Sequence, residues 1–428
     1  MIGLYALALF FVLIALGVPI VFGIGAASVM GVLLLDGSNG WAVISMQIFQ
    51  SMQSFPLVAI PMFLLMANLM GVGGVTHALV RFATSMVGHM RGSLAIGNVT
   101  ASTLFSGISG SCLADTTAVG SILIPAMVEE GYPPAFAGAV TAAANIVGPI
   151  IPPSILMVLY GFAAEISVIK LFLAGIIPGL LISLVFGFLS YWISRKNEYG
   201  NTSQKFSIQK LIFAFYASIP ALVVPLLIVT GVLGGVFTLT ESAGAAALYA
   251  LAYAIVRGSI QGRVPWREIN ASFKQTALDT GVVMFLLGTS GLLGFVLTRS
   301  QAPQFLTTLL YGFGKWETLA LINFALLFLG LFLEPAPALL LSTSLLLPLV
   351  KALGVDPVHF GIILIVNLQL GVLTPPVASA AMVTSRIAGI SFDAQIKALW
   401  PFLWVGLLAL ILITYVPALS MLVPNSFA

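Results

Sequence analysis

Apolar residues follow one another along most of the chain in runs long enough to cross a bilayer, separated by short polar segments. A membrane-spanning helix needs about 20 mainly apolar residues. The runs predict crossings near 3–35, 56–76, 133–164, 168–194, 211–234, 236–257, 275–298, 357–388 and 393–423. The first run carries no charge between Met1 and Leu35, so it lacks the basic start of a cleaved signal peptide and predicts one long helix or two short ones.

Two further apolar stretches do not fit a single span. Within the first, 92–130, nineteen of the thirty residues from 92 to 121 are Gly, Ala, Ser or Thr, centred on Ser106-Gly-Ile-Ser-Gly-Ser111. The second, 318–351, has two apolar arms joined at Glu334-Pro-Ala-Pro337. Each arm is too short to cross about 30 Å of hydrocarbon. Both stretches therefore predict re-entrant helical hairpins whose tips line a cavity, because irregular backbone at membrane depth must be covered by protein or water.

The second half of the chain repeats the first at a constant offset of 223 residues. The matched pairs are Ser121/Ser344, Pro125/Pro348, Gly131/Gly354, Pro134/Pro357, Gly138/Gly361, Gly148/Gly371, Pro152/Pro375, Pro153/Pro376 and Pro178/Pro401. The best-matched part is a Gly/Pro break inside an apolar span, which in membrane proteins is typical of a binding site at mid-depth. The repeat predicts a first half over 1–194, a polar linker over 195–210 and a second half over 211–428.

Composition supports a membrane protein, and the distribution of Lys and Arg predicts its orientation in the membrane. Hydrophobic residues make up 60% of the chain and charged ones 7%, against about 25% charged in a soluble domain. With the 195–210 linker in the cytoplasm, twelve Lys and Arg residues fall inside and four outside, as the positive-inside rule expects. The broken spans 133–164 and 357–388 then run in opposite directions. We therefore predict an all-α polytopic membrane protein of inverted-topology repeats, with two re-entrant hairpins and two discontinuous helices.

Each broken span has groups at its centre that could bind an ion. In Asn145-Ile-Val-Gly-Pro-Ile-Ile-Pro-Pro-Ser154, Gly148 and Pro149 end the helix and two later prolines remove backbone donors. Such a break frees carbonyls, which suit a hard cation, and exposes a half-helix N-terminus, which suits an anion. The second copy, Asn367-Leu-Gln-Leu-Gly-Val-Leu-Thr-Pro-Pro376, adds the hydroxyl of Thr374. One such break alone could be a proline kink without a ligand, but two inverted copies beside two hairpins favour a site.

Polar side chains near these breaks are the candidate ligands. The hydroxyls of Ser106, Ser109 and Ser111 at the first tip could hold a cation or a carboxylate, although small residues also permit close helix packing. Asp115 and Glu334 are acids deep within apolar segments, where a charge is either functional or a satisfied structural group. The candidate substrate contacts are Ser111, Asn145, Ser154 and Glu334. Glu241 instead fits a helix cap, in Thr238-Leu-Thr-Glu241.

Taken in order, these motifs resemble the large membrane subunit of TRAP transporters, the tripartite ATP-independent periplasmic systems. The resemblance rests on the serine- and glycine-rich hairpin, the Gly-Pro-x-x-Pro-Pro-Ser break, the Phe-Thr-Leu-Thr-Glu-Ser-Ala segment at 237–243 and the second Thr-Pro-Pro break. It implies a sodium-gradient-driven elevator transporter of the bacterial inner membrane that imports an organic acid such as a sialic acid or a C4-dicarboxylate. It also implies a separate small membrane subunit and a periplasmic substrate-binding protein, with no cofactor beyond sodium and no nucleic-acid partner.

The same resemblance implies two sodium sites, each formed by a hairpin tip and the neighbouring break. The residues of the first site are Ser106, Ser109, Gly148, Ile151 and Pro153, and those of the second are Gly330, Gly371, Thr374 and Pro376. Two transport alternatives remain open: a stand-alone sodium/carboxylate symporter that needs no binding protein, and a channel. An intramembrane enzyme is disfavoured, because one cysteine and three histidines offer neither a nucleophile–base pair nor a metal cluster.

Overall fold

The computed structural model describes residues 2–88, 92–200, 207–310 and 312–427, and within these ranges the regular structure is helical. Eight stretches of the described chain are long and apolar enough to cross a membrane, or up to nine if the bent pair α4–α5 is one span. The predicted all-α polytopic membrane fold is confirmed. Large apolar side chains such as Leu184, Phe213 and Phe324 lie exposed on its outer surface, as expected for a protein solvated by lipid.

The N-terminal apolar run forms two helices, which settles the alternative left by the sequence. Helix α1 spans Ile2–Ala15 and α2 spans Ile20–Asp36, and the two pack side by side. After a 3₁₀ turn at Gly37–Asn39 the chain continues as α3 (Gly40–Met52), a second 3₁₀ turn (Phe55–Val58), α4 (Ala59–Val72) and α5 (Val75–Val87). Helices α4 and α5 meet at an angle of 73°.

The first predicted hairpin is present as α6 (Ser93–Ser109) and α7 (Cys112–Glu129), joined only by Gly110 and Ser111. The expectation that each hairpin arm is too short to cross the membrane is wrong for α7 and for α16 (Pro335–Ala352), because both are among the eight stretches long and apolar enough to do so. The first broken helix follows as α8 (Pro134–Asn145), an irregular break at 146–154, and α9 (Ile155–Ala163). Proline at the start of α8 and the Ser154 side chain, which accepts a hydrogen bond from the Met157 amide, fix where these half-helices begin. The long helix α10 (Val168–Lys196) completes this half.

Of the predicted linker 195–210, residues 201–206 lie outside the described residues, as do Arg91 and Lys205 of the charge count, so the division at this point stays a prediction. Beyond it come α11 (Ile208–Leu233), α12 (Leu239–Ile260), α13 (Trp266–Arg299) and the short α14 (Ala302–Leu309). Helix α12 begins with the predicted capping box: Thr238 and Glu241 bond each other's backbone amides.

The second hairpin and broken helix repeat the first pair closely. Helix α15 (Lys315–Gly330) and α16 (Pro335–Ala352) form the hairpin, α17 (Pro357–Gly371) and α18 (Ser379–Ala388) flank the break, and α19 (Phe392–Tyr415) and α20 (Ala418–Ser426) close the chain. Helix α16 starts and ends 223 residues after α7, and α17 starts 223 residues after α8. The helix boundaries therefore carry the same offset as the sequence repeat.

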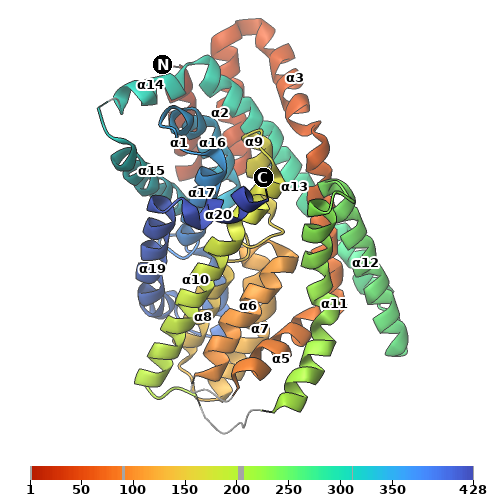
Figure 1. The fold of residues 1–428 in the computed structure, drawn as a ribbon. Helices are drawn as coiled ribbons and strands as arrows, with labels where there is room; N and C mark the ends of the chain where they lie inside the picture. The colour runs from red at the N-terminus through yellow and green to blue at the C-terminus, as the bar shows by residue number, and fades with distance from the viewer. Residues whose placement is uncertain (1, 89–91, 201–206, 311, 428) are drawn as a thin grey trace.

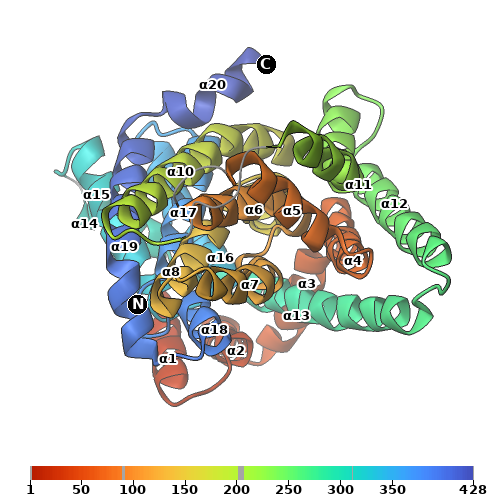
Figure 2. The same ribbon diagram turned by 90° about the horizontal axis from the view of Figure 1, so that it is seen from below.

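The two hairpins approach the middle of the molecule from opposite ends. In Figure 1, α6, α7 and α8 lie in the lower half, while α9, α15, α16 and α17 lie in the upper half. Viewed from below, α12 lies at the outer edge of the molecule and α13 runs beside the central group (Figure 2), while α11 packs against α5 and α6. Helix α13 packs along α2, α3, α4 and α16, so it joins the outer helices to the second hairpin.

Candidate functional site

Both hairpin tips and both helix breaks meet around one pocket of about 180 Å³. The tips contribute Gly110, Ser111, Cys112 and Leu113 from the first hairpin and Glu334, Pro335 and Ala336 from the second. The breaks contribute Pro149, Ile155, Leu156, Gln369, Val372 and Ser379. Four segments that are far apart in sequence thus line a single cavity. The sequence predicted a cavity at the hairpin tips.

Four helix N-termini border this pocket. The lining residues include the first residues of α7, α9, α16 and α18. The first amides of a helix have no intrahelical partner, and the aligned peptide dipoles give this end a partial positive charge. The described residues that line the pocket include no Lys, Arg or His. Any attraction that this wall offers to an anion therefore comes from backbone dipoles rather than from a basic side chain.

At the first tip, the hairpin and the break are in direct backbone contact. A Cβ atom on Gly110 would lie 2.7 Å from the carbonyl oxygen of Pro153, and Gly110 has a φ of +61°. Only glycine satisfies both the left-handed backbone and this close approach. The Ser106 hydroxyl donates to the Ser102 carbonyl at 2.7 Å, and the Ser109 hydroxyl accepts from the Ser111 amide at 3.1 Å. Both bonds lie within the hairpin, and the contact between Gly110 and Pro153 brings the tip that carries Ser106 and Ser109 next to the break.

The irregular backbone of the first break leaves carbonyl oxygens without backbone donors. Among the described residues, the carbonyls of Gly148, Ile151 and Pro153 accept no backbone hydrogen bond. The peptide bond between Pro152 and Pro153 is cis, as is its counterpart between Pro375 and Pro376. Buried carbonyls are normally paired, and oxygen atoms are the ligands that hard cations prefer. The donor set therefore fits a small hard cation such as sodium.

The second tip is built from two glycines in contact. A Cβ on Gly371 would lie 2.7 Å from the Cα of Gly330, so the end of α15 rests directly on the end of α17. The Thr374 hydroxyl donates to the Leu370 carbonyl at 2.8 Å. The carbonyls of Gly330, Thr374 and Pro376 accept no backbone hydrogen bond in the described chain, whereas that of Gly371 accepts the Thr374 amide at 2.9 Å. The four predicted residues are brought together, but with fewer hydroxyls than at the first tip.

The candidate substrate contacts separate into two groups. Ser111 and Glu334 line the pocket. Ser154 instead caps α9, because its hydroxyl donates to the Pro149 carbonyl at 2.6 Å and accepts from the Met157 amide. Asn145 lies fully buried behind the pocket, where its amide nitrogen donates to the Thr141 carbonyl at 2.7 Å and its side-chain oxygen has no partner. Asn145 and Ser154 thus shape the break rather than line the cavity.

Two further polar groups lie at the site: Asp115, for which the sequence left a functional and a structural role open, and Gln369, which the sequence did not single out. Asp115 is fully buried, neither of its carboxyl oxygens has a hydrogen-bond partner, and a Cβ on Gly148 would lie 2.6 Å from one of them. Gln369 lines the pocket and its side-chain oxygen is also unpartnered. Buried polar atoms are usually paired, so both groups have spare capacity for a ligand. The signal for Gln369 was a second amide, two residues after Asn367, inside an apolar span.

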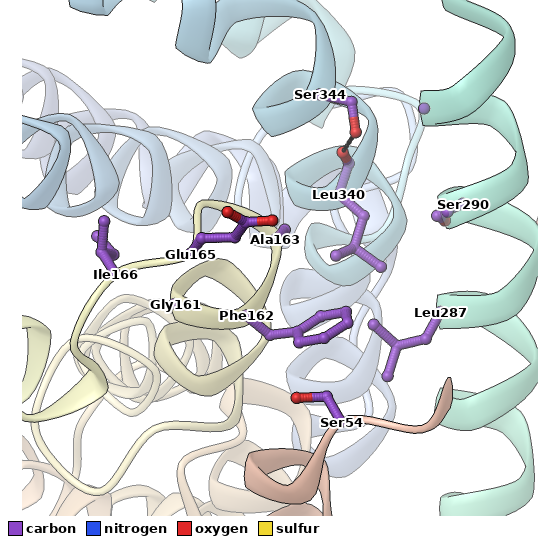
Figure 3. Close-up of a pocket in the computed structure, with 12 residues that line it drawn as sticks. Ser54, Gly161, Phe162, Ala163, Glu165, Ile166, Leu287, Ser290, Leu340 and Ser344 are labelled. Atoms are coloured by element: carbon purple, nitrogen blue, oxygen red, sulfur yellow. Dashed lines mark hydrogen bonds between the residues drawn. The ribbon is translucent and has the colours of Figure 1, made fainter. Parts of the chain in front are cut away.

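A larger pocket of about 520 Å³ lies where the second half-helix α9 and the second hairpin meet α13. Phe162 of α9 and Leu287 of α13 point toward each other across it, and Ser344 of α16 lies above them (Figure 3). Opposite Ser344, α13 presents Gly294, where an added Cβ would lie 3.5 Å from the Ser344 Cβ. Small residues therefore let α13 and α16 approach closely beside an open space.

Comparison with known proteins places this arrangement in a family. Residues 7–419 match the family described as tripartite ATP-independent periplasmic transporter, DctM component. The chain belongs to this TRAP transporter family. It is 37% identical to the sialic acid TRAP transporter large permease protein SiaM of Vibrio cholerae, over 96% of each chain, and 36% identical to the C4-dicarboxylate TRAP transporter large permease protein DctM of Pseudomonas aeruginosa, over 92% of each.

A solved structure shares the fold of this TRAP transporter chain. The YdaH transporter of Alcanivorax borkumensis superposes with a TM-score of 0.59 at 16% sequence identity, covering 90% of this chain and 91% of that one. At this identity the likeness concerns the fold alone. The family and the apolar spans together establish a multi-pass membrane permease and a transport function.

Proposed function

We propose that this chain is the large subunit of a sodium-driven importer of an organic acid. The observation that carries the proposal is the meeting of two hairpin tips and two helix breaks at one pocket, with uncommitted carbonyls directly behind it. An anion in the pocket would face four helix N-termini, and cations at the two breaks would offset its charge. The coupled binding of acid and sodium follows from this proximity, because each ion lowers the cost of burying the other.

The pocket suits a small acid in the conformation that the structure shows. Its volume of about 180 Å³ is below the roughly 300–1,000 Å³ of sites for drug-sized ligands. A C4-dicarboxylate is therefore favoured over a sialic acid unless the tips separate. Glu334 at the second tip would repel a carboxylate placed beside it, so the acid group is expected nearer Ser111 and the start of α9.

Sodium is favoured over a proton as the coupling ion by the kinds of groups at the breaks. The carbonyl and hydroxyl oxygens at the breaks bind hard cations but do not titrate in the physiological range. Asp115, whose carboxyl group lies against Gly148, is a titratable group at the first break, and a carboxylate is also a ligand that hard cations prefer. His359 is buried, but both of its ring nitrogens are engaged, with the Ser420 hydroxyl and the Thr414 carbonyl. It does not line the pocket. We therefore assign one sodium ion to the first break, at Ser106, Ser109, Gly148, Ile151 and Pro153, and another to the second break, at Gly330, Gly371, Thr374 and Pro376.

An elevator motion would carry the pocket across the membrane as one body. The hairpins and broken helices share the pocket, whereas α13 meets them across the cavity beside Phe162 and Leu287. We assign α6–α10 and α15–α19 to the moving part and α2–α4 with α11–α13 to the static part.

The exposed apolar faces of α11 and α12 (Phe213, Tyr216, Leu248 and Val256) suit contact with a separate small membrane subunit. A periplasmic binding protein would deliver the acid to this complex in the bacterial inner membrane.

The deciding experiment is uptake of labelled succinate and labelled sialic acid into proteoliposomes containing this chain and its small subunit. Each acid is tried with and without an inward sodium gradient and with and without the binding protein. Accumulation that requires both supports the proposal and names the substrate. Accumulation with sodium alone would make the protein a stand-alone symporter, and equilibration without accumulation would make it a channel.

A further inference from the structure

A long apolar groove runs along the outer surface between α6 and α10, away from the central pocket. Its volume is about 450 Å³. The two helices lie side by side in both ribbon views (Figures 1 and 2). The α6 wall is formed by Ile96, Val99, Thr100, Thr103 and Leu104, and the α10 wall by Leu180, Ser183, Leu184, Gly187, Phe188 and Tyr191. Both sets follow the three- and four-residue spacing of a single helix face.

The hydroxyls in this groove are already satisfied by the protein. Thr100 donates to the Ile96 carbonyl, Thr103 donates to the Val99 carbonyl and bonds Ser183 at 2.9 Å, and Ser183 donates to the Gly179 carbonyl. A polar ligand or a row of waters would find few open partners, since bound water needs two to four hydrogen bonds, roughly. The groove is therefore chemically suited to a hydrocarbon chain.

The length of the groove matches one leaflet of a bilayer. From Leu180 to Tyr191 the helix rises about 17 Å at roughly 1.5 Å per residue. Half of a hydrocarbon core is about 15 Å. Leu184 and Phe188 are 71% and 69% exposed and form the outer rim, while Gly187 leaves the middle open, because a Cβ there would meet only Val99 at 3.9 Å.

Basic and aromatic side chains stand at one end of this groove only. Arg195 lies one turn beyond Tyr191 and donates to its hydroxyl at 3.1 Å, and the Lys196 ammonium lies 5.1 Å from the centre of the Trp192 ring. Both cations are exposed, and the positive-inside count puts them at the cytoplasmic surface. Aromatic rings at the interface and basic groups on the cytoplasmic side are the features that hold anionic lipid headgroups.

We propose that the α6–α10 groove is a binding site for one anionic phospholipid of the cytoplasmic leaflet. An acyl chain lies along the groove between Leu180 and Tyr191, and the phosphate lies at Arg195 and Lys196. The bound chain would cover α6, the helix that carries Ser106 and Ser109 toward the first break. A transmembrane helix of a partner subunit is the competing occupant, and the experiment below separates the two.

The test titrates dioleoyl phosphatidylglycerol, and in parallel dioleoyl phosphatidylcholine, into the delipidated detergent-solubilised chain and counts bound lipids by native mass spectrometry. Gly187→Leu fills the groove and is expected to weaken the tightest phosphatidylglycerol binding at least about tenfold. The double variant Arg195→Gln/Lys196→Gln is expected to weaken phosphatidylglycerol about tenfold and phosphatidylcholine much less. Gly281→Leu and Lys210→Gln are the matched controls, because Gly281 has open space around it and Lys210 is an exposed cation elsewhere.

A second measurement uses the unaltered chain, so it does not depend on how the variants fold. Phosphatidylglycerol with a photoreactive acyl chain is cross-linked in vesicles, and the labelled peptides are mapped. Labelling concentrated on 96–104 and 180–191 supports the site. Uniform labelling of the lipid-facing helices, or unchanged lipid binding in Gly187→Leu, would overturn it. Loss of the small subunit from Gly187→Leu without loss of lipid would assign the groove to a partner helix instead.

Discussion

Gly330 and Gly371 touch through their backbones: a Cβ on Gly371 would lie 2.7 Å from the Cα and 2.8 Å from the carbonyl carbon and oxygen of Gly330. The neighbouring atoms are backbone, which cannot rotate away as a side chain can. This contact fixes how the second hairpin sits on the second broken helix, and it brings the open carbonyl of Gly330 to the break.

Replacing Gly371 by alanine is therefore expected to force α15 and α17 apart. Overpacking of this kind costs about 1–3 kcal/mol, and we expect sodium-dependent uptake to fall more than stability does. Uptake in proteoliposomes and thermal unfolding in detergent measure the two effects. Gly244→Ala is the control, since nothing lies within 4 Å of a Cβ at that position. Native-like uptake by Gly371→Ala would show that the contact does not shape the site.

Removing a hydroxyl at either break is expected to weaken sodium binding. For Ser106→Ala and Thr374→Ala we expect the sodium concentration for half-maximal uptake to rise about tenfold, because a dipole directed at a charge contributes roughly 1.5–3 kcal/mol. Thr117→Ala is the matched control: its hydroxyl also bonds a carbonyl one turn back, at 2.9 Å, but on an exposed face. An unaltered sodium dependence in both site variants would remove these hydroxyls from the cation sites.

Asp115 is expected to be required for transport but not for folding. Its buried carboxyl oxygens have no hydrogen-bond partner, so removing the side chain relieves an unpaired polar group that costs about 1–3 kcal/mol. We expect Asp115→Ala to keep or raise the thermal stability in sodium-free buffer and to lose the stabilisation that added sodium gives the native chain. A sodium-induced increase in stability equal to that of the native protein would contradict a role for Asp115 at the first break.

A covalent link between α13 and α16 is expected to stop transport. A Cβ on Gly294 lies 3.5 Å from the Ser344 Cβ, within the usual range of a disulfide, about 3.5–4.5 Å. In a Cys112→Ala background, oxidised Gly294→Cys/Ser344→Cys should lose nearly all uptake and recover it on reduction.

The control link joins α2 to α13, both in the proposed static part. Gly25→Cys/Thr289→Cys has a Cβ separation of 4.0 Å and should form a disulfide without loss of uptake. Full activity of the oxidised 294/344 pair would exclude a sliding motion at this contact.

The sequence predicted the architecture well because its strongest signals are local. Closely spaced glycine and proline disfavour a continuous helix, so the breaks after Gly148 and Gly371 and the tip at Gly110 could be located without tertiary information. Single prolines such as Pro125 and Pro178 instead lie inside helices. A repeat at constant offset then placed the second copy of each element. The capping box at Thr238 is local in the same way.

The lining of the pocket could not be predicted because it depends on which way each side chain faces. Ser111 and Ser154 are both serines beside a helix start. Ser111 lines the cavity, whereas the Ser154 hydroxyl forms two hydrogen bonds to the backbone that cap α9. Gln369 faces the cavity only because α17 rotates its amide toward the two tips. The N-terminal run was ambiguous for a related reason: hydrophobicity does not say whether a chain continues or turns back at Gly17.

The inverted repeat also bears on the relative free energies of the inward- and outward-facing forms of the protein. If the two halves were chemically identical, exchanging their conformations would produce inward- and outward-facing forms of equal free energy. Here the first tip carries a serine cluster and the second carries Glu334-Pro-Ala-Pro337. If the two halves exchange conformations as the proposed elevator motion requires, this difference removes the degeneracy. We then expect the unloaded protein to favour one open side, with the tip residues contributing to which side that is.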